Sequence, residues 1–156
     1  MKVPKPVKQV KVKKPKRKKS ARQLLIKTCD DLWSDCVIAR DQTCRYSNDD
    51  TYLSAHHIRS RGHWATRWLI DNGLTLSWRK VHFLQKANPE RFQDMVIEII
   101  GQPFYDEMKK KSQMIVNYSI ADLQDIKTYL QKDLKKIESG INLIEDGINY
   151  NKDLPF

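Results

Sequence analysis

Long apolar runs are missing from this sequence of 156 residues. No stretch approaches the roughly 20 apolar residues that a membrane-spanning helix needs. The basic start of the chain is followed by neither an apolar segment nor a small-residue cleavage site, so it does not match a secretory signal. We therefore expect a soluble, cytoplasmic protein, in the host cytoplasm if a phage encodes it.

Cysteine is scarce, with only three residues, at positions 29, 36 and 44. So small an odd number cannot form a closed disulfide framework, which suits a reducing compartment. Cys29 and Cys36 lie seven residues apart in a segment with helical periodicity, where free cysteines behave as small hydrophobic residues. We predict that both are core residues.

Acidic residues are absent from the first 19 positions, which hold ten lysines and arginines. The remaining residues carry 19 basic and 19 acidic side chains, so the net charge of +10 belongs entirely to this arm. Its prolines and its lack of large hydrophobic residues predict that residues 1–19 are disordered. Because cations on phosphates release counterions, we expect DNA binding by the arm. The residues concerned are Lys13, Lys14, Lys16, Arg17, Lys18 and Lys19. A solubilising or ribosome-binding tail would have the same composition.

Hydrophobic periodicity predicts an α+β domain over residues 20–112, with helices around a small hairpin. The first helix is predicted from Ser20, its N-cap, to about Arg40, because apolar residues recur there at three-to-four spacing. The run Asn48-Asp49-Asp50 has turn chemistry and predicts a β-hairpin whose second arm ends at two histidines.

Helix starts are predicted at Ser77, at Asn88-Pro89 and near Pro103, from N-cap residues and from proline in the first turn. A variant capping box at Ser119 begins an amphipathic helix over residues 119–140, which could pack on the core or on a second copy of the chain. Residues 141–156 are expected to form a loose tail.

Histidine is rare as well, yet all four histidines lie within the 27 residues from His56 to His82, and three of them, His56, His57 and His82, concern the site. Neighbouring residues on a strand point to opposite sides, so one of His56 and His57 can bind a metal while the other faces a substrate. His82, on the following helix, could complete the metal site. Asn72 lies in the intervening turn, where it can fix the loop through backbone hydrogen bonds.

The run AHHIRSRGHWATRWLIDNGLTLSWRKVHF, with the spacing HH-x14-N-x9-H, resembles the HNH (ββα-metal) endonucleases, specifically a stand-alone phage type. The resemblance covers about Leu25 to Met108. It implies a ββα hairpin-and-helix core with His57 as general base and Asn72 as the middle residue of the motif. It also implies that His56 and His82 hold one divalent metal ion. Mg²⁺ is the default, while two imidazole ligands would also accept Mn²⁺, Ni²⁺ or Zn²⁺.

Many members of that family contain a structural zinc held by two CxxC pairs. Here the first pair is reduced to Cys44-Arg-Tyr-Ser47, and Ser77-Trp-Arg-Lys80 replaces the second. One cysteine cannot make a four-ligand site, so we expect no structural zinc. Burial of Tyr46 and Trp78, together with the long helices, is expected to supply that stability. The last histidine is one residue later than in the family's CxxCH form, so Gln85 and Lys86 are further candidates to line the site.

Three arginines, Arg59, Arg61 and Arg67, lie in the loop before the asparagine, and we predict that they bind DNA phosphates through bidentate contacts. For Arg67 the alternative is an ion pair with Asp71.

Three other residues of this loop are assigned structural positions. His63 has no place in the motif and is expected on the surface. Trp64 and Trp68 adjoin an apolar pair and are expected in the core rather than stacked on unpaired bases.

These features together predict a metal-dependent endonuclease that hydrolyses phosphodiester bonds in DNA. Branched recombination intermediates, as for nucleases of the NinG/Rap type, and duplex DNA nicked by a homing-type or packaging-associated enzyme are both candidate substrates. The C-terminal helix would suit a homodimer. One alternative is a DNA-binding protein that keeps the HNH fold without cleavage. Another is a basic RNA-binding protein, whose binding would depend on residues 1–19 and not on His56 or His82.

Overall fold

The computed structural model describes residues 18–140, apart from the side chains of Lys80 and His82. Most of the predicted basic arm and the whole predicted C-terminal tail lie outside the described residues. The elements, in chain order, are α1 (Ala21–Asp41), β1 (Leu53–His57), the short 3₁₀ helices η1 (Trp64–Thr66) and η2 (Ile70–Asn72), β2 (Gly73–Ser77), α2 (Trp78–Ala87), α3 (Pro89–Ile100), α4 (Gln102–Ser112) and α5 (Ile120–Glu138).

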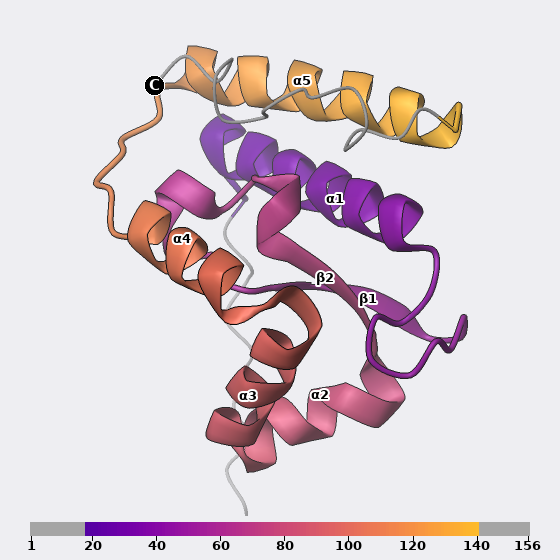
Figure 1. Cartoon of the computed structure of the whole chain (residues 1–156). Coiled ribbons are helices and arrows are strands. Elements are labelled where there is room, and N and C mark those ends of the chain that lie inside the picture. Colours follow the sequence, from indigo (N-terminus) through magenta and orange to yellow (C-terminus); the bar gives the residue numbers. More distant parts are fainter. Residues whose placement is uncertain (1–17, 141–156) are drawn as a thin grey trace, which may run out of the picture.

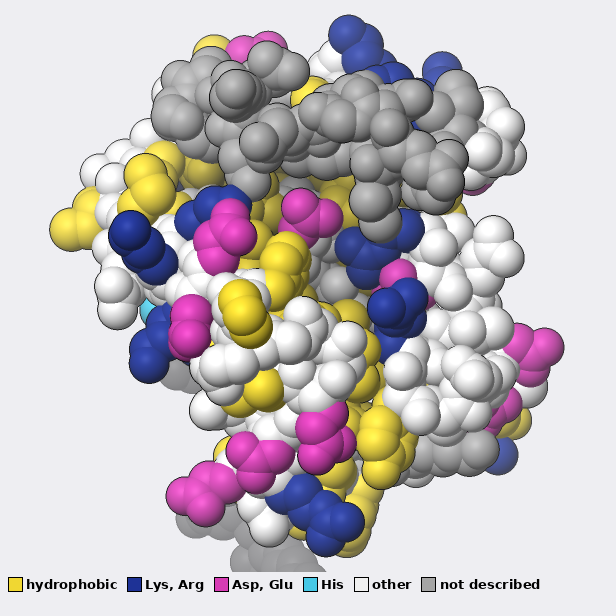
Figure 2. All heavy atoms as spheres, viewed as in Figure 1, with side chains coloured by type: hydrophobic (Ala, Val, Ile, Leu, Met, Phe, Trp, Pro, Cys, Tyr) yellow, Lys and Arg dark blue, Asp and Glu magenta, His cyan; other side chains and the backbone are white. Residues whose placement is uncertain are grey.

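The described part of the chain is a mixed α+β structure, mostly helical with one small antiparallel sheet of two strands (Figure 1). Between residues 18 and 140, no helix has the length and apolar character needed to cross a bilayer. On the face shown in Figure 2, basic and acidic side chains are interspersed around hydrophobic ones. This mixture agrees with the charge balance of the sequence beyond the basic arm.

Helix α1 begins as predicted at Ser20, whose hydroxyl accepts a hydrogen bond from the backbone N–H of Gln23. In return, Oε1 of the Gln23 side chain accepts a hydrogen bond from the backbone N–H of Ser20, which completes a capping box. Cys29 and Cys36 are fully buried on the inner face of α1, which confirms their prediction as core residues.

Helix α5 lies along α1, so the last described helix covers the first (Figure 1). Leu123 and Leu130 of α5 are buried in the same apolar cluster as the inner face of α1. The thiols of Cys29 and Cys36 donate hydrogen bonds to the carbonyls of Leu123 and Leu130, each at 3.4 Å. Of the two alternatives for this helix, packing on the core of its own chain is the one observed.

Asp133 of α5 is buried, and its Oδ2 has no hydrogen-bond partner among the described residues. Burial raises the pKa of this carboxyl to about 6, although Lys136 opposes the shift. Because the folded protein holds the proton more tightly than the unfolded chain, stability from this group is full below about pH 4 and is lost as the pH rises through 6.

We therefore expect Asp133→Asn to stabilise the protein at pH 7 by about 1–2 kcal/mol, and to have no such effect near pH 4. Urea unfolding at both pH values measures the difference. Asp125→Asn on the exposed side of α5 is the control and should change little. An equal effect of Asp133→Asn at both pH values would contradict the expectation.

Strand β1 pairs with β2 across a long loop, in an antiparallel register that places His56 opposite Leu74 and His57 opposite Gly73. The predicted hairpin about Asn48-Asp49-Asp50 is therefore wrong. Residues 42–52 form turns instead, with a left-handed backbone at Asn48 and at Tyr52. The chain folds back on itself there, because the N–H of Asn48 bonds to the Cys44 carbonyl at 2.8 Å. These local bonds satisfy backbone groups that a strand would have offered to β1.

Strand β2 is buried on both sides. On one side Thr75 faces α1, where its hydroxyl donates to the Val37 carbonyl. On the other side Leu74 and Leu76 belong to a second apolar cluster with Val81 of α2 and with residues of α3. The strand thus joins the α1–α5 pair to the α2–α3 pair.

The predicted burial of Tyr46 and Trp78 is wrong, since their exposed fractions are 55% and 51%. The second cluster is built instead from aliphatic residues of β2 and from α3, whose start at Asn88-Pro89 is as predicted. The buried apolar surface that we expected from these two aromatic rings is therefore supplied by the aliphatic side chains of β2.

Gly73 is required for the close approach of β2 to α1. A Cβ atom at this position would lie 2.4 Å from Cγ2 of Val37 and 2.9 Å from Cζ2 of Trp33. We expect Gly73→Ala to lower the free energy of unfolding by about 1–3 kcal/mol, because neither the helix nor the strand can move away without disturbing the core. Urea unfolding measures it. Gly62→Ala is the matched control, since its Cβ would meet only the Ser60 hydroxyl at 3.3 Å. Equal losses in the two variants would show that packing at Gly73 is not tight.

Candidate functional site

The two adjacent histidines at the end of β1 point to opposite sides of the sheet, as the alternation of strand side chains predicts. The ring of His57 stacks on Trp33 of α1, with centroids 3.7 Å apart and planes 13° from parallel. The ring of His56 lies on the other side, 6.3 Å from the ring of Phe92 in α3. Because Gly73 opposite His57 has no side chain, the histidine ring can reach Trp33.

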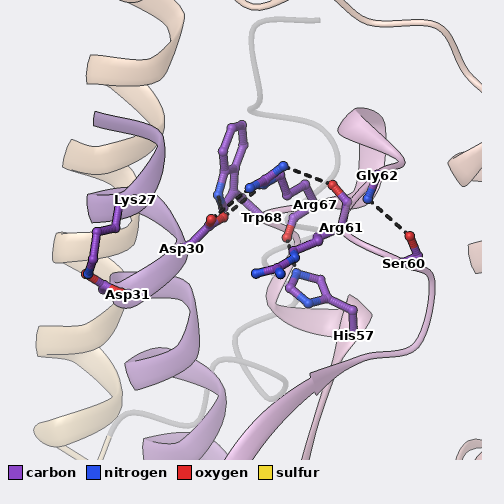
Figure 3. A network of polar contacts seen from close by, with 9 residues as sticks. All are labelled: Lys27, Asp30, Asp31, His57, Ser60, Arg61, Gly62, Arg67 and Trp68. Atoms are coloured by element: carbon purple, nitrogen blue, oxygen red, sulfur yellow. Dashed lines mark hydrogen bonds and ion pairs between the residues drawn. The ribbon is translucent and has the colours of Figure 1, made fainter. Parts of the chain in front are cut away.

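His57 is held in one neutral tautomer. Its Nε2 lies 3.0 Å from the carbonyl oxygen of Arg67, and a carbonyl can only accept, so Nε2 carries the proton (Figure 3). Nδ1 is then the nitrogen with a lone pair. Burial lowers the pKa of His57 to about 4, although the hydrogen bond to Arg67 opposes the shift. At neutral pH the ring is therefore an uncharged base with a fixed orientation.

Asn72 fixes the loop between the strands, as predicted. The side chain is fully buried, and its Oδ1 accepts a hydrogen bond from the N–H of Arg59 at 2.7 Å. Its amide nitrogen donates to the carbonyls of Arg59 and Thr66, each at 2.9 Å. Both ends of the loop are thereby tied to one side chain. Since Thr66 precedes Arg67 directly, this network also positions the carbonyl that orients His57.

The guanidinium of Arg67 is engaged by Asp30 of α1 in a bidentate ion pair, with contacts of 2.9 and 2.7 Å (Figure 3). Asp30 also accepts a hydrogen bond from the indole nitrogen of Trp68 at 2.9 Å. The alternative that we gave for Arg67 had the right kind of partner but the wrong residue, since Asp71 is not that partner. Arg67 therefore fastens the loop to α1, which leaves it few donors for a phosphate.

Arg59 and Arg61 differ in how far their side chains are engaged within the protein. The guanidinium of Arg59 donates to the hydroxyls of Ser112 and Tyr105 in α4. Arg61 is exposed, and its side chain forms no ion pair within residues 18–140. It extends beside the His57 ring in Figure 3, and its charge contributes to lowering the pKa of that histidine. Arg61 is thus the arginine of this loop best placed to receive a phosphate.

The remaining loop residues have structural roles. His63 is half-buried and its Nδ1 donates to the Ser112 carbonyl at 3.0 Å, so the expectation of a surface histidine is wrong. Contact with α4, which is distant in sequence, is the reason. Trp64 and Trp68 pack edge to face with centroids 5.6 Å apart, next to Tyr118. Trp68 is buried, which confirms it as a core residue, while Trp64 is partly buried and packs against the core.

The predicted metal ligands are described only in part. The ring of His56 is half-buried, with Nε2 hydrogen-bonded to the Ser54 hydroxyl at 3.1 Å. His82 is the fifth residue of α2, the helix that directly follows β2, and its side chain lies outside the described set. Among the side chains that the structure describes, no three His, Cys, Asp or Glu residues form a metal-binding group. The imidazole of His56, on the α2–α3 side of the sheet, is chemically suited to a divalent cation.

The HNH resemblance predicted from the sequence places zinc-ligand positions at Cys44, Ser47, Ser77 and Lys80. The first three of these residues lie close together in the structure. Burial raises the pKa of the Cys44 thiol, but the polar groups of Ser47, Ser77 and Tyr46 around it outweigh burial, and the pKa is lowered overall. The 44–47 turn and the start of α2 are therefore neighbours, although 30 positions of sequence separate them.

Sequence reasoning missed two residues of this region, Asp30 and Trp33. They lie three positions apart on the inner face of α1, which is the spacing of neighbours on a helix. The signal that could have found Asp30 is a carboxylate placed beside the apolar stripe, where an unpaired charge would be costly. Periodicity places Trp33 on the apolar face of this helix, but its contact with His57 could not be read from periodicity.

Comparisons with known proteins add no relative to this description. No protein-family model matches the chain, no curated protein matches its sequence, and no solved structure matches its fold.

Proposed function

We propose that this chain is a metal-dependent DNA endonuclease whose centre is organised like that of the HNH (ββα-metal) proteins. The observation that carries the proposal is the connection from Asn72 through the loop to His57. A fully buried asparagine fixes the backbone whose carbonyl holds His57 as a neutral base. The order of the elements also supports it, because the histidine pair ends β1, the asparagine precedes β2, and His82 lies in the helix after β2.

The hydrolytic step follows from the tautomer of His57. Nδ1 of His57 takes a proton from a water molecule, and the water oxygen forms a bond to phosphorus as the bond from phosphorus to the 3′ oxygen breaks. The leaving oxygen is protonated from solvent. With a pKa of about 4, His57 is unprotonated at pH 7, so its Nδ1 lone pair is available in nearly every molecule, although a base this weak accepts a proton less readily than one with a pKa near 7.

His56 and His82 would hold a divalent cation, which when bound supplies charge neutralisation at the phosphate. Two protein ligands leave open coordination positions for phosphate oxygens and water. The chain's own residues do the remaining work. Arg61 offers beside His57 a guanidinium that forms no ion pair with another described residue, and the Asp30–Arg67 pair keeps the loop on α1.

Relaxation of supercoiled plasmid tests the proposal. We expect the full-length protein to nick plasmid in Mg²⁺ or Mn²⁺ and to stop in EDTA, while it still binds DNA in EDTA. Retained DNA binding without nicking in any of Mg²⁺, Mn²⁺, Ni²⁺ or Zn²⁺ would favour a DNA-binding protein that lacks cleavage. Binding that prefers RNA and is abolished by deletion of residues 1–19 would favour the RNA-binding alternative.

A further inference from the structure

Large aromatic side chains are exposed around α2. Trp78 and Phe83 have exposed fractions of 51% and 76%, and Tyr52, in the segment before β1, has 50%. The guanidinium of Arg79 lies 3.7 Å from the centroid of the Tyr52 ring. Trp78, Arg79 and Phe83 line a shallow groove of about 530 Å³ together with Lys86 and Ala87. We call these residues with Tyr52 the aromatic–basic surface.

The charge of this surface has one sign. Helix α2 contains Arg79, Lys80 and Lys86 and no aspartate or glutamate. Lysine and arginine are rarely buried in a protein core, so a helix that alternates them with aromatic rings is not a typical core-facing helix. Rings that stack on bases, placed between cations that contact phosphates, are the combination by which proteins bind single-stranded nucleic acid.

We propose that the aromatic–basic surface binds unpaired nucleotides of DNA, with Trp78 and Phe83 stacking on bases and Arg79 and Lys86 contacting phosphates. A duplex would not use this surface in the same way, because its base faces are already stacked and only its phosphates are accessible. On a duplex, Trp78 and Phe83 would find no free base face to stack on. The half-exposed to largely exposed state of both rings therefore favours a single strand as the occupant.

This inference rests on the proposed function for its link to cleavage. His82, the predicted metal ligand on α2, is four positions after Trp78 and one before Phe83, so its backbone lies within one helical turn of both. A strand held on α2 would thus pass close to the proposed centre. The preferred substrates are then DNAs that combine a duplex with an unpaired segment, such as flaps, gaps and branched junctions.

Tryptophan fluorescence during titration with oligo(dT) tests the surface in EDTA, where no cleavage is needed. Trp33 and Trp68 are buried and Trp64 is half-buried, so Trp78 is the exposed reporter. We expect quenching by oligo(dT), and a loss of about tenfold or more in affinity for oligo(dT) in the Trp78→Ala/Phe83→Ala double variant. Affinity for a duplex of equal length should change less than about twofold, because phosphate contacts remain.

Two further variants distinguish stacking of bases on the aromatic rings from nonspecific hydrophobic binding of DNA. Trp78→Phe keeps a ring, so it should retain binding while losing most of the quenching. Ile115→Ala removes an exposed apolar side chain elsewhere, of exposed fraction 95%, and should leave both affinities unchanged. Unchanged oligo(dT) binding by the double variant, or an equal loss for single strand and duplex, would overturn the inference.

Failure of the proposed function gives a different pattern from failure of this inference. If oligo(dT) quenches the tryptophan fluorescence but the protein nicks plasmid in none of the metals, the aromatic–basic surface binds single strands and the nuclease proposal is wrong. If it nicks plasmid in Mg²⁺ while the double variant binds oligo(dT) like the wild type, the nuclease proposal stands and the surface has another role.

Discussion

Replacing His57 by alanine is expected to lower metal-dependent nicking of plasmid by about 100- to 10,000-fold, which is the usual contribution of a general base. The nitrogen with a lone pair is lost, and no other side chain that the structure describes is held in the same position. The measurement is the initial rate of relaxation in Mg²⁺. DNA binding in EDTA should remain, since His57 carries no charge at pH 7.

Loss of the stacked ring could also disturb Trp33, so the variant needs controls for structure. His63→Ala removes another half-buried loop histidine, one that bonds to Ser112, and should keep most of the activity. Added imidazole should restore part of the activity of His57→Ala and none to His63→Ala. Nicking by His57→Ala at the wild-type rate would rule out this histidine as the base.

Replacing Asn72 by alanine should lower the free energy of unfolding by about 3–5 kcal/mol. The substitution removes three hydrogen bonds made by a fully buried side chain and leaves backbone groups of Arg59 and Thr66 without these partners. Urea unfolding measures the loss. Nicking at a temperature where the variant is still folded should also fall, because the loop no longer fixes the carbonyl that orients His57.

Asn88→Ala is the matched asparagine control. Asn88 is an exposed N-cap whose side chain accepts one hydrogen bond, from the N–H of Arg91, so its loss should cost about 1 kcal/mol. Asn72→Asp keeps the acceptor for Arg59 but directs a carboxylate at two carbonyl oxygens, and it should be at least as harmful as alanine. Similar stabilities of the Asn72→Ala and Asn88→Ala variants would mean that the loop does not depend on Asn72.

Local signals in the sequence predicted the helix boundaries well. Ser20, Asn88 and Ser119 each cap the helix that they were expected to begin, because an N-cap acts on backbone groups only two or three residues away. The opposed orientation of His56 and His57 and the buried amide of Asn72 were predictable for the same reason. Each depends on strand geometry or on the loop that adjoins the strand.

Contacts between distant segments could not be predicted. The turn at Asn48 suggested a hairpin, yet the partner of β1 lies beyond the loop, and nothing within a few residues of either strand specifies that pairing. The pairing of Arg67 with Asp30 depends on how α1 crosses the loop. Tyr46 and Trp78 were assigned to the core from their hydrophobicity alone, while the aliphatic residues of β2 and α3 already fill that space.

The packing of α5 on α1 has a consequence for synthesis of the chain. Cys29 bonds to the carbonyl of Leu123, a partner 94 positions later. A ribosome adding 5–20 residues per second needs roughly 5–20 seconds to cover that interval. During this time Trp33 and its neighbours on the first helix have no final cover, so nascent chains that stall before residue 120 should be bound by chaperones, while those that include residue 140 and have cleared the exit tunnel should be released.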